Sequence, residues 1–178
     1  MSEPTVDDLA AVRAQLGREP RGVETVAHRC PCGLPDVVAT QPRLDDGTPF
    51  PTTFYLTCPQ ATGAVSTLES SGLMREMAGR LADDDELASR YRAAHEDYLA
   101  RRAALAHRAG MGDVPEIVGV SAGGMPTRVK CLHVLVGHAL AAGPGVNPLG
   151  DEALAALPEW WAGGPCVRPD DLSEPRRF

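Results

Sequence analysis

The stretch VETVAHRCPCGLPDVVAT, residues 23–40, decides the fold class of this chain. Residues 23–29 alternate between apolar and polar side chains well enough to predict a β-strand, and residues 35–40 are a candidate for a second strand. The segment CPCGLP between them is interrupted by proline and glycine, which is typical of a turn. We therefore expect two strands of a small sheet here, with Cys30 and Cys32 in the turn.

Strand and helix patterns continue on both sides of this stretch. Residues 52–57 are β-branched and aromatic, which predicts a third strand, and EIVGV at 116–120 predicts a short fourth one. Helical patterns dominate the rest of the chain, and the longest of them carries an apolar stripe at helical spacing. The predicted helices are one that Thr5 caps and Gly17 ends, and those at residues 60–70, 73–82, 84–109, 130–142 and 151–157.

These elements predict a single compact α+β domain over residues 1–160, rich in helix, in which helices cover a small mixed or antiparallel sheet. Residues 161–178 form a proline-rich C-terminal tail. A chain of 178 residues is long enough to bury a core of its own. Its 43% apolar and 23% charged residues are ordinary values for a globular domain.

Charge and hydropathy exclude several classes of function. The net charge of −7 disfavours a nucleic-acid partner, because binding to phosphates needs a basic surface. No run of about 18 apolar residues is present, so we expect no membrane span. The N-terminal sequence MSEPTVDDLAAVRAQLG is acidic and amphipathic, unlike a secretory signal, and this predicts a cytoplasmic protein.

The five cysteines are the first candidates for chemistry. An odd number in a reducing compartment disfavours structural disulfides, which leaves metal ligation, a reactive thiol or plain burial. Cys58 directly precedes Pro59 and should lie at or near the N-cap of the next helix, while Cys131 follows a glycine-rich loop in the first turn of its helix. The partial positive charge of a helix N-terminus stabilises a thiolate, which makes a better metal ligand or nucleophile.

We predict a cysteine-rich metal site in which sulfurs from distant parts of the chain converge. The spacing does not choose between zinc and an iron–sulfur cluster: zinc motifs usually contain paired cysteines, and dispersed cysteines also hold clusters. Burial without any metal stays open as well. The predicted ligands are Cys30, Cys58 and Cys131, with Cys166 of the tail as the fourth.

The segment GGMPTRVKCLHVLVGHAL, residues 123–140, holds a second set of candidates. Lys130 is the only lysine of the chain, beside sixteen arginines, and it stands directly before Cys131. Its ammonium would favour a thiolate, so we expect it to lie within reach of the Cys131 site or of an anion held by residues 121–126. Loop N–H groups and basic side chains before the helix could also hold a small anion, such as a phosphate or a carboxylate. The residues of this anion site are Gly123, Gly124, Arg128 and Lys130.

An enzyme that uses a thiolate without metal is the alternative to a metal protein. Cys131 would be its nucleophile and His133 or His138 its base, with Lys130 beside them, and the loop N–H groups would bind an oxyanion or a phosphate. A further alternative is a non-catalytic protein that binds a partner and whose cysteines are structural only.

Four segments of the chain resemble motifs of a bacterial protein family, the domain of unknown function 501: HRCPCGLPDVV, PFPTTFYLTCP, GGMPTRVKCLH and NPLGDE. The resemblance covers most of residues 23–155. It implies that Arg29, Cys30, Gly33, Pro35, Cys58, Pro59, Lys130, Cys131, His133, His138, Asn147 and Gly150 occupy the family's signature positions. On this ground we add Asn147 to the candidate anion-binding residues.

The resemblance carries no established activity. It implies that Cys32 is at a variable position, which leaves Cys30, Cys58, Cys131 and Cys166 as candidate sulfurs. Family members often end in a C-x-C pair, whereas this chain has Cys166 alone. Family genes tend to lie near those for septum-formation and exopolyphosphatase-like proteins, which implies a protein partner in a division pathway.

Overall fold

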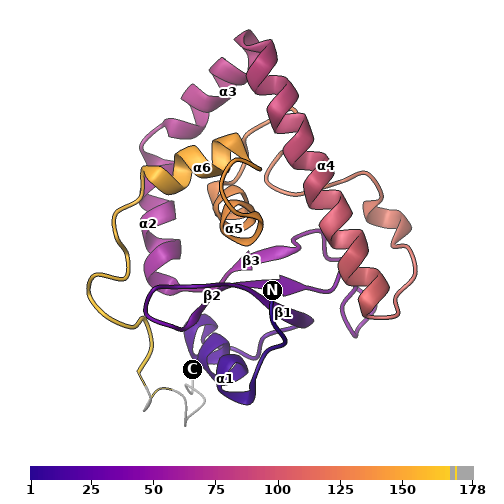
Figure 1. Ribbon diagram of the computed structural model, residues 1–178, viewed down its shortest axis with the longest axis vertical. Helices are drawn as coiled ribbons and strands as arrows, with labels where there is room; N and C mark the ends of the chain where they lie inside the picture. Colours follow the sequence, from indigo (N-terminus) through magenta and orange to yellow (C-terminus); the bar gives the residue numbers. More distant parts are fainter. Residues whose placement is uncertain (169–170, 172–178) are drawn as a thin grey trace.

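The computed structural model describes residues 1–168 and 171, and it has the predicted α+β architecture (Figure 1). Within these residues, six α-helices accompany a three-stranded sheet. The elements in chain order are α1 (Val6–Leu16), β1 (Val23–Arg29), β2 (Pro35–Thr40), β3 (Phe54–Leu56), α2 (Pro59–Ser70), α3 (Leu73–Asp83), α4 (Asp85–Arg108), the 3-10 helix η1 (Pro115–Ile117), α5 (Leu132–Ala142) and α6 (Pro148–Ala155). The rest of the predicted tail, 169–170 and 172–178, lies outside the described residues.

The sheet is antiparallel, with β2 as its central strand. β1 and β2 have the bounds that the sequence predicts, and Val26 pairs with Val38 across them. β3 is shorter than predicted, and its Leu56 pairs with Val37. Every residue of β2 is buried, because α1 packs against this strand on one face of the sheet and α5 on the other.

The helices cover the two faces of the sheet unequally (Figure 1). Among the described elements, α1 alone lies on one face, while α5 packs on the other with α2, α4 and α6 around it. The core between α5 and the sheet contains Phe54, Tyr98 and Leu135, all fully buried. α5 comes close to β3 at Gly137, where an added Cβ would lie 3.0 Å from the carbonyl oxygen of Phe54.

The longest helix, α4, agrees closely with the prediction from its apolar stripe. Asp84 caps it by accepting the N–H of Leu87 at 2.9 Å. Its buried residues are Tyr91, Ala94, Tyr98, Arg102 and Leu105. Within the described part of the chain, neither this helix nor another is apolar over the length that a membrane span requires.

The prediction of a fourth strand at residues 116–120 is wrong, since Pro115–Ile117 form the 3-10 helix η1. The buried guanidinium of Arg102 donates to the carbonyls of Ile117 at 2.7 Å and Val120 at 2.6 Å. These carbonyls therefore find their partners in a side chain of α4 and need no neighbouring strand. Gly119, with a φ of 68°, also breaks the extended backbone.

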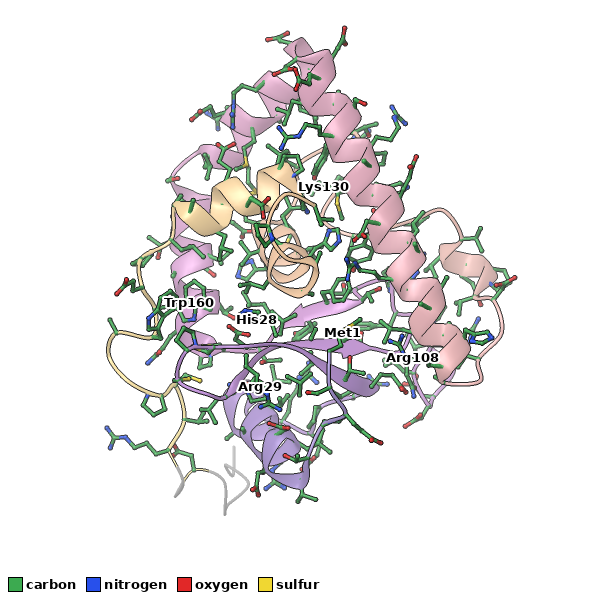
Figure 2. All side chains as sticks on the ribbon, viewed as in Figure 1. Met1, His28, Arg29, Arg108, Lys130 and Trp160 are labelled. Atoms are coloured by element: carbon green, nitrogen blue, oxygen red, sulfur yellow. The ribbon has the colours of Figure 1, made fainter. Side chains whose placement is uncertain are left out.

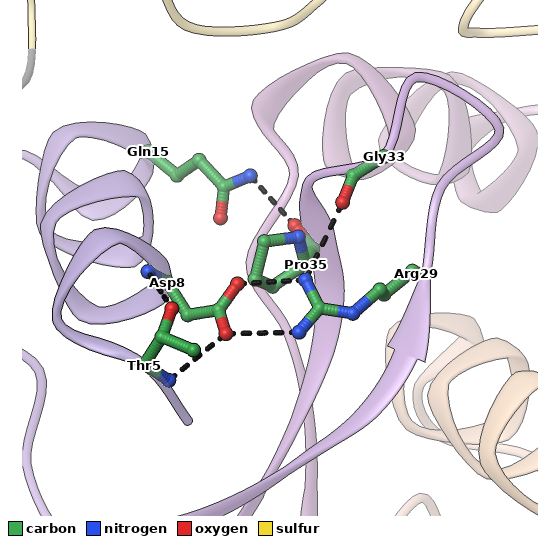
Figure 3. A network of polar contacts seen from close by, with 6 residues as sticks. All are labelled: Thr5, Asp8, Gln15, Arg29, Gly33 and Pro35. Atoms are coloured by element: carbon green, nitrogen blue, oxygen red, sulfur yellow. Dashed lines mark hydrogen bonds and ion pairs between the residues drawn. The ribbon is translucent and has the colours of Figure 1, made fainter. Parts of the chain in front are cut away.

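An ion pair joins α1 to the end of β1 (Figure 3). The carboxylate of Asp8, which is 7% exposed, accepts two hydrogen bonds from Arg29, at 2.6 and 2.8 Å. Asp8 also forms the capping box of α1 with Thr5, by hydrogen bonds of 3.0 and 3.1 Å. Together, the hydrogen bond from Arg29 and the Thr5 cap outweigh the effect of burial and hold the pKa of Asp8 well below its usual range. Further along α1, the amide of Gln15 donates to the carbonyl of Pro35 at 2.7 Å.

We expect Asp8→Asn to lower the free energy of unfolding at neutral pH by about 1–2 kcal/mol, a modest value because Arg29 also contacts water. The pKa of Asp8 is lower in the folded than in the unfolded chain. Its contribution is therefore complete above the unfolded pKa of about 3.9 and is lost as the pH falls below it. Urea unfolding of both proteins at neutral pH and near pH ~3 measures this. A difference in stability that is the same at both pH values would contradict the ion-pair account.

Candidate metal centre

Three side chains that can ligate a metal meet at the N-terminus of α5. Cys131 is the N-cap of this helix, with φ −157° and ψ 112°, and its thiol makes no capping hydrogen bond. Glu69 of α2 takes over that role, because its Oε1 accepts the first helical N–H, that of Leu132, at 2.6 Å. A carboxylate at this position is stabilised by the partial positive charge of the helix N-terminus.

The imidazole of His133 lies between these two groups and α2. Its Nδ1 is 3.2 Å from Oε1 of Glu69 and 3.9 Å from Sγ of Cys131. Its Nε2 is 3.2 Å from the carbonyl oxygen of Thr62 and 3.3 Å from the hydroxyl of Ser66. One ligand atom from each of Glu69, Cys131 and His133 lies within 4.8 Å of the other two, and no second group of this kind occurs among the residues described.

The ring of His133 has a strongly raised pKa. The hydrogen bond with Cys131 and the charge of Glu69 outweigh desolvation and raise the pKa of His133 to about 9. In the metal-free chain at neutral pH, both ring nitrogens therefore carry a proton. The side chains of His133 and Glu69 are 25% and 24% exposed, so the centre is open to solvent and to small molecules.

Cys58 and Cys166 lie together at a different place. Cys58 is the N-cap of α2, as predicted, and it is fully buried. Interaction with the thiol of Cys166, together with burial, raises the pKa of Cys58. The same interaction lowers the pKa of Cys166 to about 6 despite desolvation. The amide of Gln15 supports it by donating to Sγ of Cys166 at 3.2 Å.

Cys30 lies directly after β1. It is buried next to Cys32, and burial is the main cause that raises the pKa of Cys30 to about 11. Within the described residues, no three cysteine sulfurs lie within 4.8 Å of one another. The binding of a metal by Cys30, Cys58 or Cys166 therefore stays a prediction.

The loop before α5 folds back on itself. Gly123 and Gly124 have φ values of 70° and 95°. Their carbonyls accept hydrogen bonds from the backbone N–H groups of Lys130, at 2.8 Å, and Arg128, at 2.9 Å. Both basic residues are exposed, and within the described part of the chain their side chains form no hydrogen bond or ion pair. Lys130, labelled in Figure 2, thus makes no hydrogen bond with the neighbouring Cys131, and its contact with a bound anion stays a prediction.

His138 lies two turns further along α5 and is fully buried. Its Nε2 donates to Oδ2 of Asp97 at 2.9 Å, and its Nδ1 accepts from the amide of Asn147 at 3.2 Å. Asn147 is also the N-cap of α6, because its Oδ1 accepts the N–H of Gly150 at 3.0 Å. Burial lowers the pKa of His138, so a neutral ring joins α4, α5 and α6. His138 and Asn147 thus hold these three helices together through hydrogen bonds. Neither belongs to the group of Glu69, Cys131 and His133.

A model of the family described as "Protein of unknown function (DUF501)" matches residues 26–155. The chain belongs to this family. The matched range contains all three residues of the DUF501 chain's candidate metal centre, together with Cys30 and Cys58, whereas Cys166 lies beyond it. Comparisons with curated proteins and with solved structures found no match.

The sequence of this DUF501 chain indicates Cys131 and His133 but not Glu69. Glu69 is a single acidic residue in the segment STLESS of α2, and nothing in that segment distinguishes it from an ordinary exposed glutamate. Thr62 contributes its backbone carbonyl, which any residue type would supply. Only the packing of α2 against α5 brings these groups to the centre.

Proposed function

We propose that this DUF501 protein binds a divalent transition metal through Glu69, Cys131 and His133, with zinc as the ion that fits best. The observation that supports this most strongly is that the sulfur of Cys131 and the carboxylate of Glu69 face the same ring nitrogen, Nδ1 of His133. Three donor atoms directed to one point form the arrangement that a bound cation needs. When the metal binds, it would displace the proton that Nδ1 carries in the metal-free chain.

The types of donor atom favour zinc over other ions. Zinc accepts sulfur, imidazole nitrogen and carboxylate oxygen together in one site. Calcium and magnesium prefer oxygen ligands alone, and iron–sulfur clusters are held mainly by several thiolates. One thiolate, one imidazole and one carboxylate therefore support the zinc version of the metal prediction.

The second ring nitrogen supports the same conclusion. Nε2 of His133 is 3.2 Å from the carbonyl of Thr62, to which it donates. Histidines that bind a metal usually donate their other ring N–H to a carbonyl or carboxylate, which fixes the ring. In a catalytic triad, by contrast, the nucleophile and the carboxylate contact opposite ring nitrogens. Here they share one, so the geometry favours a metal centre over a thiolate enzyme.

Three protein ligands would leave a fourth position on the metal. Zinc sites that take part in reactions keep such a position for water or substrate, which the metal polarises. The partial exposure of His133 and Glu69 leaves room for an external ligand. Because the exposed Arg128 and Lys130 precede Cys131 and carry positive charge, we propose a small anion as that ligand.

Metal titration tests this proposal directly. We expect the wild-type protein, stripped with a chelator, to bind one zinc ion, and Cys131→Ser, His133→Gln and Glu69→Gln each to weaken binding by about 100-fold or more. Cobalt in place of zinc should give a sulfur-to-metal absorption band that Cys131→Ser abolishes. Competition with a zinc-sensitive dye measures the affinities.

Cys32→Ser is the matched control, because Cys32 is also partly exposed but lies outside the centre. It should bind zinc as the wild type does. Failure of the wild type to bind zinc would overturn the proposal. Equal affinity in Cys131→Ser and the wild type would do so too, as would a loss in Cys58→Ser in place of Cys131→Ser.

A further inference from the structure

The sheet carries a cavity of about 300 Å³ on the face that α1 covers, away from α5 (Figure 1). Val38 and Thr40 of β2 line it, together with Tyr55 of β3 and Val23 of β1. Val38 pairs with Tyr55, and Thr40 with Val23, across the antiparallel sheet. Side chains alternate between the two faces of a strand, so these four share one face, while the alternate residues of β2 belong to the core on the α5 side.

Two segments of the chain form the walls of this cavity. The end of α1 and the turn after it contribute Leu16 and Pro20, and the loop between β2 and β3 contributes Leu44 and Phe50. The segments approach each other at Gly22, where an added Cβ would lie 2.8 Å from Cδ2 of Leu44. The cavity is therefore enclosed by a close contact between its walls.

Most of the lining is apolar, and part of it is open to solvent. Val38 and Leu44 are buried, whereas Phe50 and Tyr55 are only partly buried, with ring centroids 6.4 Å apart. Covering aromatic surface in a concave site with an apolar group is favourable. Small-molecule sites commonly measure about 300–1,000 Å³, so a cavity at the lower end of this range fits a small ligand.

The charged part of the lining is basic. Arg18 and Arg21 line the cavity, and no acidic side chain of the described residues does so. Arg21 forms an ion pair with Asp46, and both side chains are half exposed. Arg18 donates to the backbone carbonyl of Glu19 at 3.3 Å and forms no ion pair within the described part of the chain. In a protein with a net charge of −7, two arginines at one cavity favour an anionic group there.

We propose that this cavity binds a small amphipathic carboxylate, such as a medium-chain fatty acid. The apolar chain packs against Val23, Val38 and Leu44, and the carboxylate lies beside Arg18 and Arg21. The site is on the opposite face of the sheet from α5, so it is separate from the proposed metal centre and does not depend on it. Both arginines precede the residues that the family model matches, so the inference rests on the structure of this chain alone.

Octanoate is the probe for the test. It is titrated into the whole ¹⁵N-labelled chain, and amide NMR spectra record which residues respond. We expect saturable shifts around the cavity, at residues 18–23, 38–44 and 50–55, and none at residues 131–133. Octanol has the same chain without the charge and should bind about tenfold more weakly, the effect of losing two ion pairs at a partly exposed site. Octylamine, with the opposite charge, should bind more weakly still.

Phenylpropionate distinguishes the two kinds of apolar body that a natural ligand could carry. Its ring would pack beside Phe50 and Tyr55, whereas the aliphatic chain of octanoate suits the rest of the lining. Saturable binding of either acid at the cavity supports the carboxylate site. The acid with the higher affinity then identifies the natural ligand as aliphatic or aromatic.

Variants test the contribution of charge. Arg18→Gln and Arg21→Gln should each weaken octanoate binding by about threefold and leave octanol binding unchanged. Asp46→Asn should strengthen octanoate binding by about twofold, because it releases Arg21 from its ion pair. Arg75→Gln is the matched control, since Arg75 is an exposed arginine of α3 outside the cavity. All four positions are exposed, so the variants should keep the wild-type fold, which the spectra without ligand verify.

The proposal is wrong if octanoate at millimolar concentration gives no saturable shifts, or if octanol and octylamine bind as tightly as octanoate does. Equal affinity for octanoate in the wild type, Arg18→Gln and Arg21→Gln would also contradict it. Shifts at Cys131 and His133 in place of the cavity would assign the carboxylate to the candidate metal centre instead.

Discussion

Gly150→Ala is expected to lower the free energy of unfolding by about 3 kcal/mol, because an added methyl group has no space between α5 and α6. A Cβ at this position would lie 2.4 Å from the carbonyl oxygen of Leu135 and 3.0 Å from Cβ of Ala139, both in α5. The carbonyl cannot move without its helix, so α6 must shift away. That shift would also pull Asn147, the N-cap of α6, from His138.

Gly79→Ala in α3 is the matched control for this substitution. A Cβ at Gly79 would meet no atom within 4 Å. Alanine should therefore leave the stability unchanged or raise it by up to about 1 kcal/mol, since it favours a helix more than glycine does. Urea unfolding followed by circular dichroism compares the three proteins. Similar stability in Gly150→Ala and Gly79→Ala would refute the close approach of the two helices.

Tyr98→Ala should cost about 3–5 kcal/mol of unfolding free energy, the range for removal of a large buried aromatic side chain. Tyr98 is fully buried, and its ring centroid is 5.5 Å from that of Phe54 and 5.2 Å from that of His138. Its hydroxyl accepts the backbone N–H of Thr53 at 2.6 Å and donates to the carbonyl of Pro51 at 3.2 Å. The side chain thus packs α4 against α5 and also holds the segment that enters β3.

Tyr98→Phe isolates the contribution of the hydroxyl. It keeps the ring but leaves the N–H of Thr53 and the carbonyl of Pro51 without a partner, so we expect a loss of about 1–3 kcal/mol. Tyr55→Phe is the control, because Tyr55 is only partly buried, and its effect should stay within about 0.5 kcal/mol. Thermal and urea unfolding give both values. If Tyr98→Phe and Tyr55→Phe have equal free energies of unfolding, the hydroxyl of Tyr98 does not stabilise the fold and the prediction is wrong.

The parts of the fold that the sequence predicts well are set by local chemistry. The strands at 23–29 and 35–40 have their predicted bounds, since proline and glycine in CPCGLP end one and start the other. The cap at Thr5, the end at Gly17 and the N-cap at Cys58 depend on neighbouring residues only, and the structure has all three.

The parts that the sequence leaves open depend on contacts between distant segments. Residues 116–120 have the composition of a strand, but Arg102 of α4 donates hydrogen bonds to the carbonyls of Ile117 and Val120. Glu69 becomes a ligand candidate only because α2 lies against the N-terminus of α5. Cys58 and Cys131 are both helix N-caps, and this shared position does not predict which side chains surround each sulfur. The surroundings of each cysteine therefore follow from tertiary packing, which spacing along the chain does not encode.

The amide of Gln15 has a consequence for the dynamics of the protein. It ties α1 to the carbonyl of Pro35 and to the sulfur of Cys166 at the same time. A local opening that detaches α1 from the sheet breaks both hydrogen bonds together, since one amide makes them. Hydrogen–deuterium exchange in α1 and the reactivity of the Cys166 thiol toward reagents in solvent should therefore be governed by one opening equilibrium. Detachment of the first helix would expose this partly buried thiol further.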